Sequence, residues 1–310
     1  MGYRGLATSL TIITVISLGP ASAAGQPRSS SGAGVELNGL VVSEDASTLP
    51  RTPWGRPDLH GLWNNSTTTP LERMTAEEKA RGRQAQRAVT EATGGTGAGW
   101  LELGGGLDRE SLIVDPPDGR LPARTPEAEQ RAEARRAVER PPFPRGPEDL
   151  GGGLRCGGGR VPMTGRGYNS NYQIVQSAGH VAILMEMMHD IRIIPLDDRP
   201  HLTSAIRTAL GDARGHWEGD TLVVETTNLK RGSGGATREL RLVERFTRVA
   251  QDTLQYEYTM HDPTTWTQPW TARIFMRPAP GTGVIYEFAC HEGNYALEHT
   301  LRGARLQEGR

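Results

Sequence analysis

The stretch LRLVERFTRVAQDTLQYEYTMHD, residues 240–262, decides the fold predicted for this chain. Two runs rich in β-branched and aromatic residues, 240–249 and 253–260, flank the turn signal Ala250-Gln251-Asp252. In the second run apolar and polar residues alternate, so that the aromatic side chains share one face and Glu257 lies on the other. This alternation has the period of a β-strand. The stretch therefore predicts an antiparallel β-hairpin.

The sequence around this hairpin contains further β-strand patterns. Further strands are predicted at 171–176, 181–188, 191–195, 221–227, 270–276 and 284–289, most of them separated by short turn signals. One short helix is predicted at 202–210, where Gly211 ends it. About eight strands with few helices predict a mainly β fold, an antiparallel meander that closes into a lipocalin-like β-barrel, because closure removes the exposed sheet edges. A β-sandwich is the alternative.

Composition divides the chain into four parts. Residues 1–24 have a short basic start, an apolar run and a small-residue A-x-A site, which is the pattern of a secretory signal peptide; an uncleaved anchor is the alternative. Residues 25–50 are predicted to be a flexible leader. We expect 51–165 to form a helical and Gly/Pro-rich arm that wraps the core, and 166–310 to form the barrel domain. The predicted location is secreted or periplasmic.

The charge balance excludes some classes of partner. The chain has 35 Lys and Arg residues against 36 Asp and Glu residues, for a formal net charge of −1. Such a chain has no overall field that attracts nucleic acid or an anionic membrane. We expect no nucleic-acid partner and, after removal of the signal, no membrane span. The oligomeric state is left open.

The two cysteines, Cys156 and Cys290, lie in the part that would be exported. In an oxidising compartment two lone thiols in one domain form a disulfide more often than a redox or nucleophilic site. We therefore predict a disulfide that ties the Gly-rich segment before the barrel to the last strand. A nucleophilic Cys290 beside His291 is disfavoured, because adjacent residues on a strand point to opposite faces.

Two helices are predicted within the arm. Thr75 and Glu78 have the spacing of a capping box, which starts a helix running to about residue 90. Thr125 followed by Pro126 starts a second helix, of mixed charge, running to about residue 139. The neighbouring Gly runs lack the Lys-Ser/Thr ending of a P-loop, and we interpret them as linkers.

Four segments share a tight turn, an apolar strand and a glutamate. They align on Glu186, Glu225, Glu257 and Glu287. Three of them finish with a histidine beside an acid, namely His189-Asp190, His261-Asp262 and His291-Glu292. Every second strand of a meander runs the same way, so these ends should meet at one rim of the sheet. Taken alone, Glu225 and Glu257 are expected on the solvated outer face.

The rim is the predicted catalytic site. A histidine exchanges a proton near pH 7, a neighbouring carboxylate fixes its tautomer, and an arginine holds an oxyanion. We expect His291 and His189 to act as acid and base. In this scheme Glu292 and Asp190 orient the imidazoles, and Arg192 holds the anion.

Four further residues are candidate substrate contacts. They are His201, Trp266, Tyr295 and Tyr172. Aromatic rings of this kind stack on a sugar or an aromatic ligand, although a structural anchor in the core is the alternative. The alternative for His201 is a turn residue before the predicted helix.

A metal centre is another use of the same histidines. His189, His201 and His291 with Asp190 or Glu292 would supply ligands for zinc or iron. The chain has no H-x-H, H-E-x-x-H or C-x-x-C spacing, so we assign no metal ligands and identify no cofactor. It also lacks the G-x-S-x-G elbow of a serine hydrolase.

Several motifs carry resemblances. Gly61-x-Trp63 resembles the G-x-W at the first strand of lipocalin-like barrels. Four longer motifs resemble a large family of secreted bacterial proteins of unknown function: R-x-I-P-L-D at 192–197, WEGDTLVVETTN at 217–228, DPTTW at 262–266 and CHEGNY at 290–295. This second resemblance covers roughly the last half of the chain. It implies export and a shared fold, and it supplies no activity or catalytic residue.

Three functions follow as hypotheses. The first is a secreted or periplasmic β-barrel enzyme that performs acid/base chemistry of the lyase, isomerase or hydrolase type on a small polar or cyclic molecule. The second is a lipocalin-like small-molecule binding protein without catalysis. The third is an interaction protein of the cell envelope or matrix, whose helical arm at 75–140 docks a partner.

Overall fold

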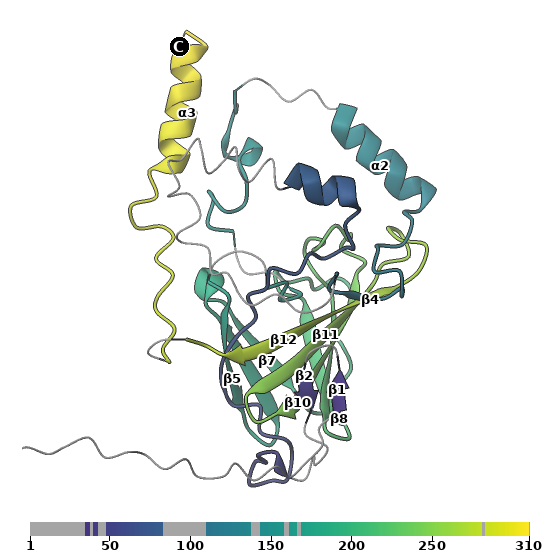
Figure 1. Cartoon of the computed structure of the whole chain (residues 1–310). Coiled ribbons are helices and arrows are strands. Elements are labelled where there is room, and N and C mark those ends of the chain that lie inside the picture. Colours follow the sequence, from purple (N-terminus) through teal and green to yellow (C-terminus); the bar gives the residue numbers. More distant parts are fainter. Residues whose placement is uncertain are drawn as a thin grey trace, which may run out of the picture. The chain divides into compact units, whose positions relative to one another are not determined.

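The fold is described by a computed structural model (Figure 1). It describes residues 35–37, 40–42, 48–82, 110–137, 143–157, 161–165, 169–280 and 283–309. The predicted signal peptide and most of the predicted leader lie outside the described residues. The far ends of the two helices predicted in the arm also lie outside them.

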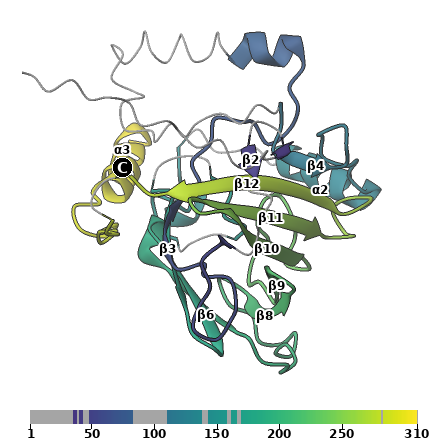
Figure 2. The same ribbon diagram turned by 60° about the horizontal axis from the view of Figure 1, so that its bottom comes forward.

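One large antiparallel sheet, in which the order of the strands departs from their order in the sequence, dominates the described chain. Nine strands follow one another in the order β7-β6-β5-β3-β12-β11-β10-β9-β8, and β4 pairs with β12 beside this path. The strands are β3 (Gly61–Asn64), β4 (Ile113–Asp115), β5 (Asn171–Gln176), β6 (His180–Met185), β7 (Ile191–Pro195), β8 (Asp212–Glu218), β9 (Thr221–Thr227), β10 (Arg241–Ala250), β11 (Thr253–His261) and β12 (Trp270–Pro278). Figure 2 shows β12, β11, β10, β9 and β8 following one another. A separate pair joins β1 (Val35–Leu37) to β2 (Leu40–Val42).

The mainly β prediction is confirmed, but barrel closure is not. All strand pairs on the path are antiparallel, and its two ends, β7 and β8, are not paired with each other. Side chains bridge these ends instead. A Cβ atom on Gly215 of β8 would lie 2.7 Å from Leu196 Cδ2 and 2.8 Å from Ile194 Cγ2, so the side chains of the β7 end press directly on the β8 backbone. We call this contact the β7–β8 seam.

The β10–β11 hairpin forms as the alternation predicts. Phe246 pairs with Tyr256 in the register, both are fully buried, and their ring centroids lie 5.0 Å apart. On the other face Glu257 lies opposite Arg273 of β12 and accepts a hydrogen bond of 2.8 Å from its Nε. The apolar face therefore packs inward, and the aligned glutamate faces outward in a cross-strand ion pair.

Rings from neighbouring strands fill the inner face of the sheet. Tyr258 and Trp270 lie 5.8 Å apart in an edge-on arrangement, and Trp266 meets Trp270 edge-on at 5.5 Å. Each of these side chains is at most 4 % exposed. Edge-on aromatic pairs add about 0.5–1.5 kcal/mol beyond the burial of their area. A packed aromatic core thus covers the inner face of the sheet.

Three predicted elements differ from the structure. Residues 284–289 form no strand, and the segment from Gly283 to Asn294 runs largely exposed. Residues 202–210 form turns in place of a helix. The strand predicted to reach residue 188 stops at Met185 and continues as a short 3-10 helix, η4 (Met187–His189), in which Met188 takes a positive φ of 63°.

The helix starts are confirmed. Glu78 N donates to Thr75 Oγ1 at 3.1 Å and Thr75 N donates to Glu78 Oε2 at 2.7 Å, the two bonds of a capping box, and the helix is described over 76–82. Ala128 N donates to Thr125 Oγ1 at 3.1 Å at the start of α2 (Pro126–Ala137). The remaining elements are η3 (Pro147–Asp149) and a C-terminal helix that was not predicted, α3 (Ala296–Gln307).

The predicted disulfide is confirmed. Cys156 and Cys290 are bonded, with their Cα atoms 5.8 Å apart, and among the described residues no cysteine is free. Beside it Asn294 Nδ2 donates to Leu154 O at 3.0 Å. The disulfide therefore ties the Gly-rich segment to the exposed C-terminal segment, although not to a strand.

Asp262 organises the turn after β11. Its carboxylate accepts hydrogen bonds from Thr237 N, from Thr264 N and Oγ1, and from Thr265 Oγ1, and the residue is 1 % exposed. Burial alone raises the pKa of this carboxyl, but the hydrogen bonds from Thr264, Thr237 and Thr265 outweigh it and hold the pKa below its ordinary value.

Replacing Asp262 with Asn is expected to lower the free energy of unfolding by about 2–3 kcal/mol at neutral pH, because an amide cannot accept all of these bonds. A depressed folded pKa contributes stability that is present above the unfolded pKa, about 4, and is lost as the pH falls through the folded value. The gap between the two proteins in urea denaturation should therefore shrink below about pH 4. A gap that stays constant on acidification would contradict this account.

Candidate functional site

Three of the four repeats contribute strands that run in the same direction. β6, β9 and β11 run in the same direction, because an even number of antiparallel pairings separates them. Their ends carry His189, Asn228 and His261, as the repeat predicts. The fourth repeat contributes no strand, so His291 and Glu292 lie on the exposed C-terminal segment.

His189 lies in the turn between β6 and β7. The residue is exposed, and its backbone takes a positive φ of 54°. Among the described residues, the ring of His189 makes no hydrogen bond or ion pair, and neither does the ring of His291. Acid and base roles for this pair stay a prediction, and no contact in the described chain joins the two rings.

Arg192 lies in the core, which corrects its predicted role as an anion holder at the rim. The residue is 3 % exposed, and Glu244 of β10 is fully buried beside it. Arg192 Nη1 donates to Glu244 Oε1 at 3.0 Å, Nη2 donates to Glu244 Oε2, and Nη2 also contacts Thr226 Oγ1 at 3.3 Å. Its charge is therefore neutralised by Glu244 inside the fold.

Two of the predicted substrate contacts are also core residues. Trp266 is 4 % exposed and packs edge-on against Trp270. Tyr172 of β5 is buried, and its burial raises the pKa of the phenol to about 12. Neither ring presents a face to solvent, so the structural alternative holds for both. Tyr295 is exposed and stacks on His299 at the start of α3, with ring centroids 5.8 Å apart.

His201 is the predicted contact that the structure places in a polar cluster. His201 Nδ1 lies 2.9 Å from Asp212 Oδ2, and Nε2 lies 3.5 Å from Glu225 Oε1. The imidazole side chain is 25 % exposed, whereas that of Asp212 is only 6 % exposed. A partly exposed histidine thus stands between two carboxylates, one of them buried.

Both carboxylates are held in place by other groups. Leu202 N donates to Asp212 Oδ2 at 2.8 Å, and Arg214 Nη1 lies 2.6 Å from Asp212 Oδ1. Arg241 hydrogen-bonds Glu225, and this bond is the main reason why the pKa of Glu225 falls below its ordinary value. Glu225 is therefore an anion near neutral pH.

The strands explain this geometry. Asp212 and Arg214 on β8 and Glu225 on β9 lie on the outer face, because their neighbours Ala213 and Val224 point into the core. The turns over 197–210 cross this outer face and bring His201 onto it. Alternation along β8 could have shown the shared face, but no sequence signal indicates where the turns cross.

A cleft borders the residues on either side of Asp212 in sequence, although none of His201, Asp212 and Glu225 is among its described lining residues. It measures about 280 Å³ and lies between the start of β7 and the segment 208–213. Asp190, Arg192, Gly211 and Ala213 are among its lining residues, and the last two flank Asp212 in sequence. Ile191 and Ile193 also line it, and these side chains are 56 % and 58 % exposed. The β7 wall of the cleft therefore combines two exposed apolar side chains with Asp190 and Arg192.

The described chain has neither a cluster of metal ligands nor a helix that could span a membrane. No three His, Cys, Asp or Glu side chains there converge as metal ligands would. In the same residues no helix has both the length and the apolar character needed to cross a bilayer. No protein-family model matches the sequence, and no curated protein is significantly similar to it.

Proposed function

We propose that the protein is an exported enzyme that transfers a proton on a small polar or cyclic molecule, with His201 as the acid/base and Asp212 as its positioning residue. The observation that carries this proposal is the 2.9 Å contact from His201 Nδ1 to a buried carboxylate. Such a partner fixes the ring's orientation and tautomer and leaves Nε2 for chemistry. His201 thereby takes the role first expected of His189 and His291.

Glu225 gives the site a second charged group. Its carboxylate lies 3.5 Å from His201 Nε2, farther than the usual hydrogen-bond distance of about 2.9 Å, so Nε2 is not tightly engaged. A substrate proton donor or acceptor placed at Nε2 would also meet a carboxylate held as an anion by Arg241. Two groups of this kind support elimination, isomerisation or hydrolysis without a covalent intermediate.

The cleft supports a small substrate with an apolar face. Its volume of about 280 Å³ is near the lower end of the range for ligand pockets, roughly 300–1,000 Å³. The exposed Ile191 and Ile193 offer an apolar wall for one face of a ring. The disulfide supports export to an oxidising compartment.

A lipocalin-like carrier is the alternative function. A carrier of this type holds its ligand inside the sheet. Here the inner face is filled by large rings, those of Phe246, Tyr256, Tyr258 and Trp270. This packing favours a site on the outer face, and therefore the enzyme.

Deuterium exchange tests the enzyme directly. The purified protein is incubated in D₂O with a panel of small sugars, hydroxy acids and lactones, and NMR follows turnover or the exchange of a carbon-bound proton. For a compound that reacts, His201→Gln is expected to lower the rate by about 10²–10⁴-fold, the usual contribution of an acid/base group.

His216→Gln is the matched control. His216 lies on β8, is exposed, and contacts Glu218 at 3.2 Å, so the variant loses a histidine–carboxylate pair without touching the cluster. It should retain the wild-type rate. A rate unchanged in His201→Gln, with circular dichroism like that of the wild type, would show that His201 only anchors the turns over 197–210.

A further inference from the structure

A second cavity lies beside α2. It measures about 560 Å³ and lies between α2, the loop before β10 and the loop after β11. Its described lining residues include three arginines, Arg124, Arg131 and Arg135, and no acidic residue. The remaining walls are Thr, Ala and Gly side chains. The described lining therefore carries three positive charges and no negative charge, and its other residues are small.

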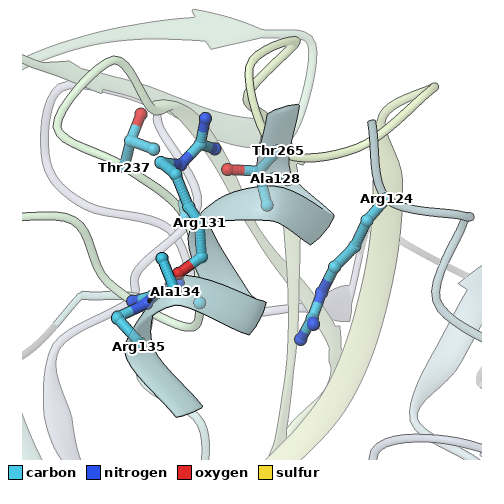
Figure 3. A pocket seen from close by; sticks show the side chains of 9 residues that line it. Arg124, Ala128, Arg131, Ala134, Arg135, Thr237 and Thr265 are labelled. Atoms are coloured by element: carbon cyan, nitrogen blue, oxygen red, sulfur yellow. Dashed lines mark hydrogen bonds between the residues drawn. The ribbon is translucent and has the colours of Figure 1, made fainter. Parts of the chain in front are cut away.

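Two of the arginines lie on one face of α2, and the third, Arg124, lies just before the helix. Arg131 and Arg135 are four residues apart on α2 and so lie on the same side of it. Figure 3 shows the guanidinium of Arg131 directed toward Thr237, whereas the side chain of Arg124, from the segment before α2, extends away from that guanidinium in this view. Arg131 Nη2 donates to Thr264 O at 2.6 Å, which fixes this side chain against the cavity wall.

The charges of these arginines are largely unneutralised. Within the described chain, neither Arg131 nor Arg135 has a carboxylate partner, and their hydrogen bonds go to backbone carbonyls. Arg124 has only a distant ion pair, 3.8 Å from Glu129. The carboxylate of Asp262 does not line the cavity, although two of its hydrogen-bond donors, Thr237 and Thr265, do.

The walls are fixed in advance of any ligand. Thr125 N donates to Thr265 O at 3.0 Å, and Thr125 Oγ1 donates to Thr264 O at 3.1 Å. Thr267 N donates to Ala123 O at 2.9 Å. These bonds clamp the start of α2 onto the loop after β11, so a ligand meets a preorganised site.

We propose that this cavity binds a small molecule carrying two or more oxyanion groups, either phosphates or carboxylates. Guanidinium groups form paired hydrogen bonds with these planar or tetrahedral oxyanions. Three of them around a cavity of this volume suit a multiply charged ligand better than a single small ion. The site is separate from His201 and independent of the proposed catalysis.

Isothermal titration calorimetry at low ionic strength tests this site. The full protein is titrated with pyrophosphate in one arm and with citrate in the other, which distinguishes phosphate from carboxylate recognition. One saturable site is expected for at least one probe, weakened by added salt because the contacts are charged. Arg131→Gln and Arg135→Gln should each weaken binding by about tenfold or more.

Arg136→Gln is the matched control, because it removes the same charge from the same helix but Arg136 does not line the cavity. It should leave the affinity for the probe within about twofold of wild type. Equal weakening by all three variants would mean nonspecific attraction to a basic helix and would overturn the proposal. Failure of both pyrophosphate and citrate to bind would also overturn it.

Discussion

Replacing Arg192 with alanine is expected to lower the free energy of unfolding by about 3–5 kcal/mol, because it leaves the charge of Glu244 buried without a partner. Glu244 is fully buried, and it also accepts a hydrogen bond of 2.8 Å from Tyr256 Oη. Burial alone lowers the pKa of the Arg192 guanidinium, but the charge of Glu244 outweighs it and raises the pKa above its ordinary value. Arg192 is thus charged in the folded protein.

The double variant Arg192→Met with Glu244→Leu tests whether the loss of stability comes from the unpaired charge of Glu244, because it removes both charges and keeps the volume filled. Replacing a buried ion pair with apolar residues of similar size is often neutral or stabilising, so this variant should recover most of the loss. Arg51→Ala is the exposed control, since it breaks an ion pair with Asp220 on the surface. Urea denaturation measures all three. A midpoint for Arg192→Ala no lower than that of Arg51→Ala would contradict the account.

Replacing Cys156 and Cys290 together with serine is the second large change. The disulfide closes a loop with a sequence separation of 134 residues. For such a loop the chain-entropy account gives a loss of up to about 5 kcal/mol. In the described part of the chain, Asn294 and Arg305 also donate to the backbone of Leu154 and Arg145, which lie in the same region as Cys156. We therefore expect the C-terminal segment to detach before the sheet unfolds.

Limited proteolysis measures this local effect, and thermal unfolding measures the global one. The serine variant should be cut within residues 283–309 much faster than the oxidised wild type, and wild type treated with a reductant should behave like the variant. Detachment while the sheet stays folded would keep the measured global loss below the full chain-entropy value. Equal cleavage rates for the oxidised wild type and the variant would show that packing alone holds the segment.

Seven strands of the sheet were predictable because local alternation determines them, whereas β3, β4 and β8 were not predicted. Residues 253–260 alternate without a break, and β11 matches them closely. The strand predicted at 284–289 failed for the opposite reason. Its residues have high β-propensity, but propensity describes how a side chain fits a sheet and supplies no neighbouring strand.

The candidate site was only partly predictable because its contacts cross between elements. The pattern Leu242-x-Glu244-x-Phe246 places an acidic side chain on the apolar face of the strand, which indicates a buried charge. Its partner Arg192 is 52 residues away, and only the strand order brings the two together. His201 and Asp212 meet through turns that carry no recognisable pattern.

At the β7–β8 seam the two end strands of the sheet meet without backbone hydrogen bonds between them. Elsewhere, separating two neighbouring strands means breaking a row of backbone hydrogen bonds. At the seam Ile194 and Leu196 pack on Gly215, and Arg192 of β7 reaches across it to Thr226 and Glu244. Opening the seam therefore means breaking a buried ion pair as well as an apolar contact, so this charged pair holds the two ends of the sheet together where backbone hydrogen bonds are missing.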